Sequence, residues 1–145
     1  MKKLLLSLSM IALLSSVSMA AVQNIAVVDV PAVVAKSAQV QNLKKEQKAK
    51  MADLEKWLKN AQTDVNKQTA KESKEKLLKK YNAEFAKKKQ TLASDYQKKL
   101  SAIDKSITET ITTKARALGY DMVISKSMVI MGGDDITAEI QKVVK

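Results

Sequence analysis

The chain has 145 residues, with 26 lysines and arginines against 15 acidic residues and no cysteine or histidine. The length fits a single domain, and the missing side chains exclude disulfides, an ordinary zinc site and the commonest general base. Stability must therefore come from packing within the chain or from association between copies.

The first 20 residues have the pattern of a secretory signal peptide. Lys2 and Lys3 form a basic start, residues 4–17 are mostly apolar, and residues 18–20 place small side chains where a signal peptidase reads them. The alternative is an uncleaved membrane anchor, but the apolar run is shorter than the roughly 20 residues of a spanning helix. We expect export and cleavage after Ala20, which lowers the net charge from +11 to +9.

The mature chain begins with a predicted strand at residues 25–30, which are mostly β-branched and are followed by Pro31. Proline fits the first turn of a helix, where its missing N–H costs little. From residue 32 to Val65, apolar side chains recur every three or four residues, with Gln47 as the polar exception. This spacing predicts a long helix with one apolar stripe.

A second apolar stripe runs from Leu78 to Leu118, after a polar stretch at residues 66–73, and Ser73 is its predicted helix cap. No glycine or proline lies between residues 32 and 118, so we expect two long uninterrupted helices. Folding the chain back near residues 70–71 brings the stripes opposite each other, with Trp57 facing Phe85. This match favours an antiparallel coiled-coil hairpin with its tip near residues 67–73 over one continuous rod.

The positive charge is concentrated in this predicted arm. Residues 36–118 hold 21 basic and 10 acidic residues, whereas the mature flanks hold 3 basic and 5 acidic residues. A field confined to one part of a molecule indicates a working surface for acidic partners.

The C-terminal part predicts a small β-rich unit. Gly119 ends the second helix, and residues 120–125 and 128–131 are predicted strands joined by a tight turn. Residues 132–135 form a loop, and Asp135 caps a last helix at residues 136–144. The predicted fold class is α+β, with the helical arm at residues 36–118 on a body made of residues 21–35 and 119–145.

A body of this size cannot bury an adequate core alone, and its strands leave open edges. We therefore expect oligomerisation through the body, although these arguments do not fix the number of copies. The predicted association residues are the apolar strand positions Ile25, Val27, Val28, Val30, Met122, Ile124, Val129 and Ile130.

The most specific pattern lies at residues 117–127 and 129–137: a helix ending in Gly119-Tyr120-Asp121, a strand pair, then Gly132-Gly133 and a capped helix. Together with the signal peptide, the first strand and the basic hairpin, it resembles the Skp (OmpH-like) family of periplasmic chaperones. The resemblance implies a periplasmic homotrimer whose three arms enclose a cavity. It also implies ATP-independent holding of unfolded outer-membrane proteins.

Lysines of the arm are the predicted client contacts, because their charge attracts acidic segments and their apolar stems cover apolar ones. The spacing of Trp57 and Phe85 favours packing within the arm, with a client-binding aromatic pair as the alternative. The three lysines at residues 87–89 are either an anion-binding patch or a solvated helix face. The candidate contacts are Lys44, Lys48, Lys59, Lys71, Lys74, Lys80 and Lys87.

We expect neither an enzyme nor a cofactor or metal site. Ser73 and Lys76 have the spacing of penicillin-recognising enzymes, but the companion motifs are absent, and residues 125–127 fall in a predicted tight turn. Asp134 and Asp135 are too few ligands for calcium. No phosphate-loop pattern occurs in the chain.

Two other functions fit the charge. Basic arms on an envelope structural or adsorbed protein bind anionic lipid or lipopolysaccharide head groups. Nucleic-acid binding also fits a basic chain, but the signal peptide and the scarcity of aromatic residues argue against a specific nucleic-acid partner.

Overall fold

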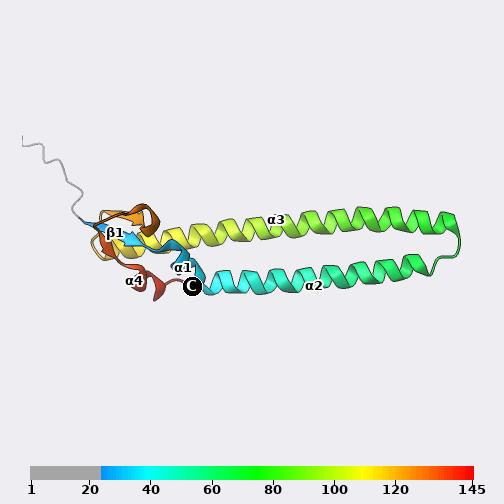
Figure 1. The fold of residues 1–145 in the computed structure, drawn as a ribbon, viewed down its shortest axis with the longest axis horizontal. Coiled ribbons are helices and arrows are strands. Elements are labelled where there is room, and N and C mark those ends of the chain that lie inside the picture. The colour runs from blue at the N-terminus through cyan, green and yellow to red at the C-terminus, as the bar shows by residue number, and fades with distance from the viewer. Residues whose placement is uncertain (1–23) are drawn as a thin grey trace, which may run out of the picture.

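The computed structural model describes residues 24–145, and the predicted signal peptide at residues 1–20 lies outside this range. Two long helices run side by side away from a small sheet (Figure 1), which confirms the predicted α+β class with a long helical arm. No helix in the described range has an apolar stretch long enough to cross a bilayer. The elements are β1 Ile25–Val28, α1 Val30–Lys36, α2 Ala38–Asn66, α3 Lys71–Ala117, β2 Met122–Ser125, the 3-10 helix η1 Lys126–Met128, β3 Asp134–Asp135 and α4 Thr137–Gln141.

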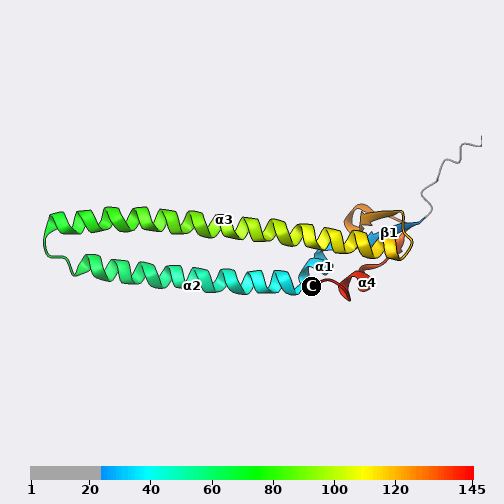
Figure 2. The same cartoon turned by 180° about the vertical axis from the view of Figure 1, so that it is seen from behind.

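From here on, the arm denotes residues 38–106 rather than the predicted 36–118, because Ile107, Ile111 and Ala115 belong to the core, and the rest of the described chain is the body. The arm holds α2 and the part of α3 beside it, and the C-terminal segment returns to the base of α2 (Figures 1 and 2). Hydrogen bonds fix this return: Gln141 Nε2 donates to the Ala32 carbonyl at 3.1 Å, and the Gln39 amide donates to the Lys145 carbonyl at 3.3 Å.

The predicted uninterrupted helix from residue 32 is wrong, because Ser37 separates α1 from α2. Its backbone is extended (φ −63°, ψ 124°) and its side chain is fully buried. The Ser37 hydroxyl accepts from the Val40 amide at 3.4 Å and donates to the Lys145 carbonyl at 2.5 Å. The helix cap and the two hydrogen bonds of the buried Ser37 hydroxyl stabilise the break more than an unbroken helix would.

The start of the chain also differs from the predicted strand at residues 25–30. Strand β1 ends at Val28, and Val30 already belongs to α1. Asp29 caps that helix: its carboxylate accepts from the Ala32 amide at 3.0 Å. Pro31 lies in the first helical turn, as predicted.

At the far end of the arm, α2 ends at Asn66 and α3 begins at Lys71. The prediction that Ser73 caps the second helix is wrong, since the cap residue is Ala70 and it makes no side-chain bond. The Lys74 amide already donates to the Ala70 carbonyl at 3.0 Å, so Ser73 lies inside the first turn.

The sheet is parallel and has the order β2-β1-β3. Strand β1 pairs with β2 from Ile25↔Met122 onward and with β3 at Ala26↔Asp134. The predicted hairpin of two C-terminal strands is therefore wrong, and residues 129–131 form no strand. Because β2 and β3 run in the same direction on opposite sides of β1, the segment between them must carry the chain across and is not available as an antiparallel partner.

Gly133 lies where this crossing segment passes closest to β1. Its φ is +81°, and a Cβ atom there would lie 2.6 Å from Val27 Cγ2 and 3.3 Å from the Ile25 carbonyl oxygen. Only glycine accepts this backbone conformation without steric cost and leaves room for the strand.

The hydrophobic core lies in the body, where α1, α4 and the last turns of α3 cover β1. The α3 contribution ends in a glycine cap. The Gly119 amide donates to the Arg116 carbonyl at 3.0 Å, and the Tyr120 amide donates to the Ala115 carbonyl at 3.1 Å, which confirms the predicted helix end. The core residues are Ala26, Val28, Val33, Ile107, Ile111, Ala115, Ile136 and Ile140.

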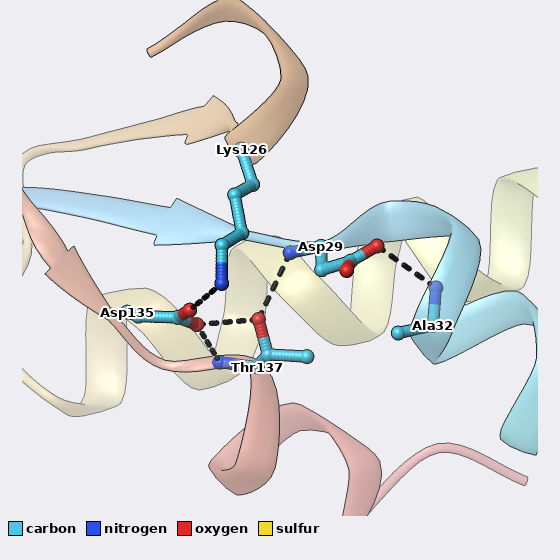
Figure 3. A network of polar contacts seen from close by, with 5 residues as sticks. All are labelled: Asp29, Ala32, Lys126, Asp135 and Thr137. Atoms are coloured by element: carbon cyan, nitrogen blue, oxygen red, sulfur yellow. Dashed lines mark hydrogen bonds and ion pairs between the residues drawn. The ribbon is translucent and has the colours of Figure 1, made fainter. Parts of the chain in front are cut away.

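A polar network joins the two parts of the chain that make the body (Figure 3). Lys126 donates to the Asp135 carboxylate at 2.7 Å, and this carboxylate also accepts from the Thr137 amide and hydroxyl. The Thr137 hydroxyl in turn accepts from the Asp29 amide at 2.9 Å. These bonds place β3 and the start of α4 against the end of β1.

The last helix starts at Thr137 and is shorter than the predicted 136–144.

Candidate functional site

The seven lysines predicted as client contacts are all exposed. Three come from α2 and four from α3, and they are spread from the base of the arm to its tip, so they form no compact site. Only Lys80 has a carboxylate partner, Glu84 at 3.9 Å.

Most of the positive charge on the arm is unpaired. A lysine ammonium without a carboxylate within 4 Å keeps its full attraction for an approaching acidic group. Among the described residues, the arm lysines with an ion-pair partner are Lys50, Lys67, Lys80, Lys99 and Lys105.

One charged cluster ties the two helices together in the half of the arm nearest the body. Lys50 lies 3.0 Å from the Glu46 carboxylate and 3.7 Å from that of Asp95, and Lys99 of α3 donates to Glu46. Hydrogen bonds from Lys99 and then Lys50 hold the pKa of Glu46 below its ordinary value. The cluster favours the ionised glutamate and holds the helices in register.

An aromatic cluster lies farther along the arm. Trp57 stacks on Phe85 with ring centroids 6.3 Å apart and an interplanar angle of 3°, as the folded-back sequence predicts. Trp57 also meets Tyr81 edge to face at 5.7 Å. The Tyr81 hydroxyl donates to Asp64 at 3.1 Å. Partial burial is the larger cause that raises the pKa of Tyr81, and this hydrogen bond is the second.

The predicted association residues of the body fall into two groups. Val27 and Val28 are buried in the core of their own chain, and Val30 packs against that core. Met122 is exposed to solvent, and Ile130 is fully exposed. Ile25, Ile124 and Val129 are half-buried.

Sequence reasoning missed three members of the open apolar surface of the body. The large apolar residues close together in the C-terminal segment were a signal for this surface. The prediction instead placed them in two paired strands. We call this surface the apolar strip; it consists of Met122, Val123, Met128, Ile130 and Met131, and the last two are 105% and 93% exposed.

The two serine–lysine groups considered above do not form catalytic pairs: one lysine is bonded to a carboxylate, and the other pair is exposed to solvent. Lys126 donates to Asp135, and this hydrogen bond raises the pKa of Lys126, so its amine is protonated and is no general base. Ser73 and Lys76 lie on an exposed turn of α3. No group of three or more acidic, cysteine or histidine side chains able to hold a metal occurs in residues 24–145.

The structure thus combines a basic helical arm with accessible apolar side chains and a small parallel sheet. The sequence pattern of the family described as "Outer membrane protein (OmpH-like)" matches residues 24–144. The chain belongs to the OmpH-like family, and the resemblance is confirmed. No curated protein matches the chain. The family is periplasmic, and its members are chaperones rather than enzymes, so a chaperone-type function follows in general.

Proposed function

We propose that this protein is an ATP-independent holdase that keeps unfolded outer-membrane β-barrel proteins soluble in the periplasm. The observation that carries the proposal is the coexistence, on one arm, of unpaired lysines with partly exposed apolar side chains. Leu58 and Leu78 are 41% and 42% exposed beside lysines that have no carboxylate partner. Unfolded barrel chains expose alternating apolar residues, which such a surface covers without tight packing.

The active form in this proposal is a homotrimer held together by the body. The apolar strip supports association, because Met128, Ile130 and Met131 are 78%, 105% and 93% exposed in the single chain. Contiguous exposed apolar side chains mark interaction surfaces. Three arms on one body would place their unpaired lysines around a shared space and raise the positive potential there.

The first test is the mass of the mature chain in solution, measured by light scattering after size separation. We expect three copies alone and three copies plus one client after mixing with an unfolded outer-membrane barrel protein. Ile130→Asp should yield a folded single copy, because it places a charge in the apolar strip. A wild-type chain that stays a single copy contradicts the trimer.

The second test is suppression of aggregation when a urea-denatured barrel protein is diluted into buffer. Replacing the seven candidate lysines with glutamate should abolish suppression, and replacing them with arginine should preserve it. Helical content by circular dichroism checks that both variants are folded. If stoichiometric wild-type trimer leaves light scattering unchanged, the holdase function is refuted.

A second candidate function is adsorption to anionic lipid or lipopolysaccharide through the arms. The lysine density near the tip favours it: within 14 residues lie Lys67, Lys71, Lys74, Lys76, Lys79 and Lys80, all exposed. Each basic residue near an anionic membrane contributes about 1 kcal/mol of attraction. Co-sedimentation with anionic vesicles at physiological salt tests this function, and absence of protein from the pellet refutes it.

A further inference from the structure

The buried apolar side chains between the two arm helices lie toward the ends of the arm, and none of the described side chains in the middle of the seam is buried. Near the tip, Ala61 and Val65 are only 6% exposed, and near the body Leu43 is 7% exposed. Between these buried positions, Met51 and Leu58 on α2 are 44% and 41% exposed. On α3, Leu78 and Leu100 are 42% and 39% exposed. The middle of the seam therefore leaves apolar surface in contact with solvent.

Two grooves follow this open part. The first has a volume of about 480 Å³ and is lined by Leu54, Trp57 and Leu92 together with charged side chains. The second has a volume of about 410 Å³ and shares Leu54 and Leu92, with Leu58 and Phe85 beside them. Both volumes fall in the range of sites that hold small ligands or single large side chains.

The aromatic rings in these grooves carry cations on their faces. Lys88 Nζ lies 5.3 Å from the centre of the Trp57 ring, and Lys89 Nζ lies 5.5 Å from that of Phe85. Such contacts hold a lysine over a ring without neutralising its charge.

The unpaired charges along the grooves are divided between the two helices: Asp53 and Glu55 lie on α2, and the lysines at residues 87–89 lie on α3. Of the carboxylates that line the first groove, Glu84 and Asp95 already pair with lysines of the arm. None of the ion pairs among residues 24–145 involves the lysines at residues 87–89. The α3 edge formed by these lysines is thus complementary to carboxylates of a ligand whose apolar groups enter the grooves.

We propose that this open seam, from Met51 to Leu58 on α2 and from Phe85 to Leu92 on α3, binds an extended segment of unfolded polypeptide. Large apolar or aromatic side chains of the segment enter the grooves, and neighbouring carboxylates meet the lysines at residues 87–89. The inference rests on the proposed holdase function. It places part of the client between the two helices of one arm, in addition to any space enclosed by several arms.

The chain's single tryptophan lies in the first groove and reports on its occupancy. The probe is a tryptophan-free decapeptide that alternates phenylalanine or valine with glutamate, and the control peptide has serine in place of the apolar residues. We expect a saturable change in the emission of Trp57 with the first peptide alone. An unchanged Trp57 spectrum at saturating peptide overturns the proposal.

Matched charge variants test the lysine edge. The triple variant Lys87→Gln, Lys88→Gln and Lys89→Gln should bind the peptide roughly fivefold more weakly, since it loses three solvent-exposed ion pairs, each of which contributes little. The control removes three exposed lysines of the same helix that line neither groove and are not candidate contacts, at Lys76, Lys79 and Lys98. Equal affinities of the two triple variants would overturn the role of residues 87–89.

Cross-linking with a full-length client separates this inference from the holdase function. The chain lacks cysteine, so Thr91→Cys and Ser94→Cys each accept one thiol-reactive benzophenone. Thr91 lines the first groove, whereas Ser94 lines neither groove and is exposed on α3. We expect several-fold more client cross-linked at position 91.

Equal or greater cross-linking at position 94, with aggregation still suppressed by both labelled variants, overturns the seam site and leaves the holdase function intact. Failure of wild-type chain to suppress aggregation counts against the holdase function instead. The peptide titration then still decides whether the seam binds unfolded chain.

Discussion

Replacement of Gly133 by alanine tests how the crossing segment is held against β1. The residue has a φ of +81°, which costs an alanine roughly 1–2 kcal/mol. The added methyl group also falls 2.6 Å from Val27 Cγ2, and Val27 is only 5% exposed and has little room to move. Overpacking of this kind costs about 1–3 kcal/mol. The expected total is about 2–5 kcal/mol, a large share of the roughly 5–15 kcal/mol that stabilises a typical domain.

The neighbouring glycine supplies the matched control. Gly132 has a φ of +90°, but a Cβ atom there meets nothing within 4 Å. Gly132→Ala should therefore cost only the backbone term of about 1–2 kcal/mol. The two variants should differ mainly by the steric term, because the two glycines are adjacent and both are exposed.

The measurement is urea unfolding of the mature chain, followed by circular dichroism at one fixed chain concentration so that association contributes equally. Amide hydrogen exchange at β1 provides a second readout, and it should accelerate more in Gly133→Ala than in Gly132→Ala. Equal midpoints and equal exchange in the two variants would refute the argument that the crossing segment needs glycine to approach the strand.

Three further predictions concern the core, the polar network and the arm. Ile140→Ala should lower the free energy of unfolding by about 2–5 kcal/mol, because the side chain is fully buried, whereas Val143→Ala, at a 43% exposed position, should cost much less in the same titration. Hydrogen bonds from a lysine and a threonine hold the pKa of Asp135 well below its ordinary value, so its contribution to stability is complete above about pH 4 and falls as the pH drops further. Asp135→Asn should flatten the acid side of the stability profile, and Asp121→Asn, an exposed carboxylate without an ion pair, should not. Glu46→Gln leaves the two lysines that it bridges without their shared carboxylate, so amide exchange should accelerate in the adjacent turns of both arm helices; unchanged exchange would show that the cluster does not hold the arm together.

The helices of the arm were predictable because their signals are local. A stripe at helical spacing, a polar interruption and a glycine after the last turn are all read within a few residues of one another. The stacking of Trp57 on Phe85 follows from the same spacing once the chain folds back.

The features that sequence reasoning missed depend on distant residues. Ser37 interrupts a good helical pattern because its buried hydroxyl finds the carbonyl of Lys145, far along the chain. Asp134 and Asp135 carry no strand signal, yet they pair with β1, while the more strand-like residues 129–131 remain unpaired.

The candidate site was predictable in kind but not in detail. Exposure of the lysines follows from their type. Which of them are neutralised depends on the register of the two helices, which brings Lys99 to Glu46 and leaves residues 87–89 without partners. The grooves beside Trp57 depend on the same register and have no counterpart in the sequence pattern.

The position of β1 at the centre of the sheet affects the order in which the elements of the chain fold. Both of its neighbours, β2 and β3, come from roughly 100 residues later in the chain. The two arm helices are joined by a short loop, and near the tip they contact each other at short sequence separation. They can therefore pack together before β1 has paired with another strand. The sheet closes only when β3, at residues 134–135, reaches β1. The arm can thus form before the sheet at its base is complete.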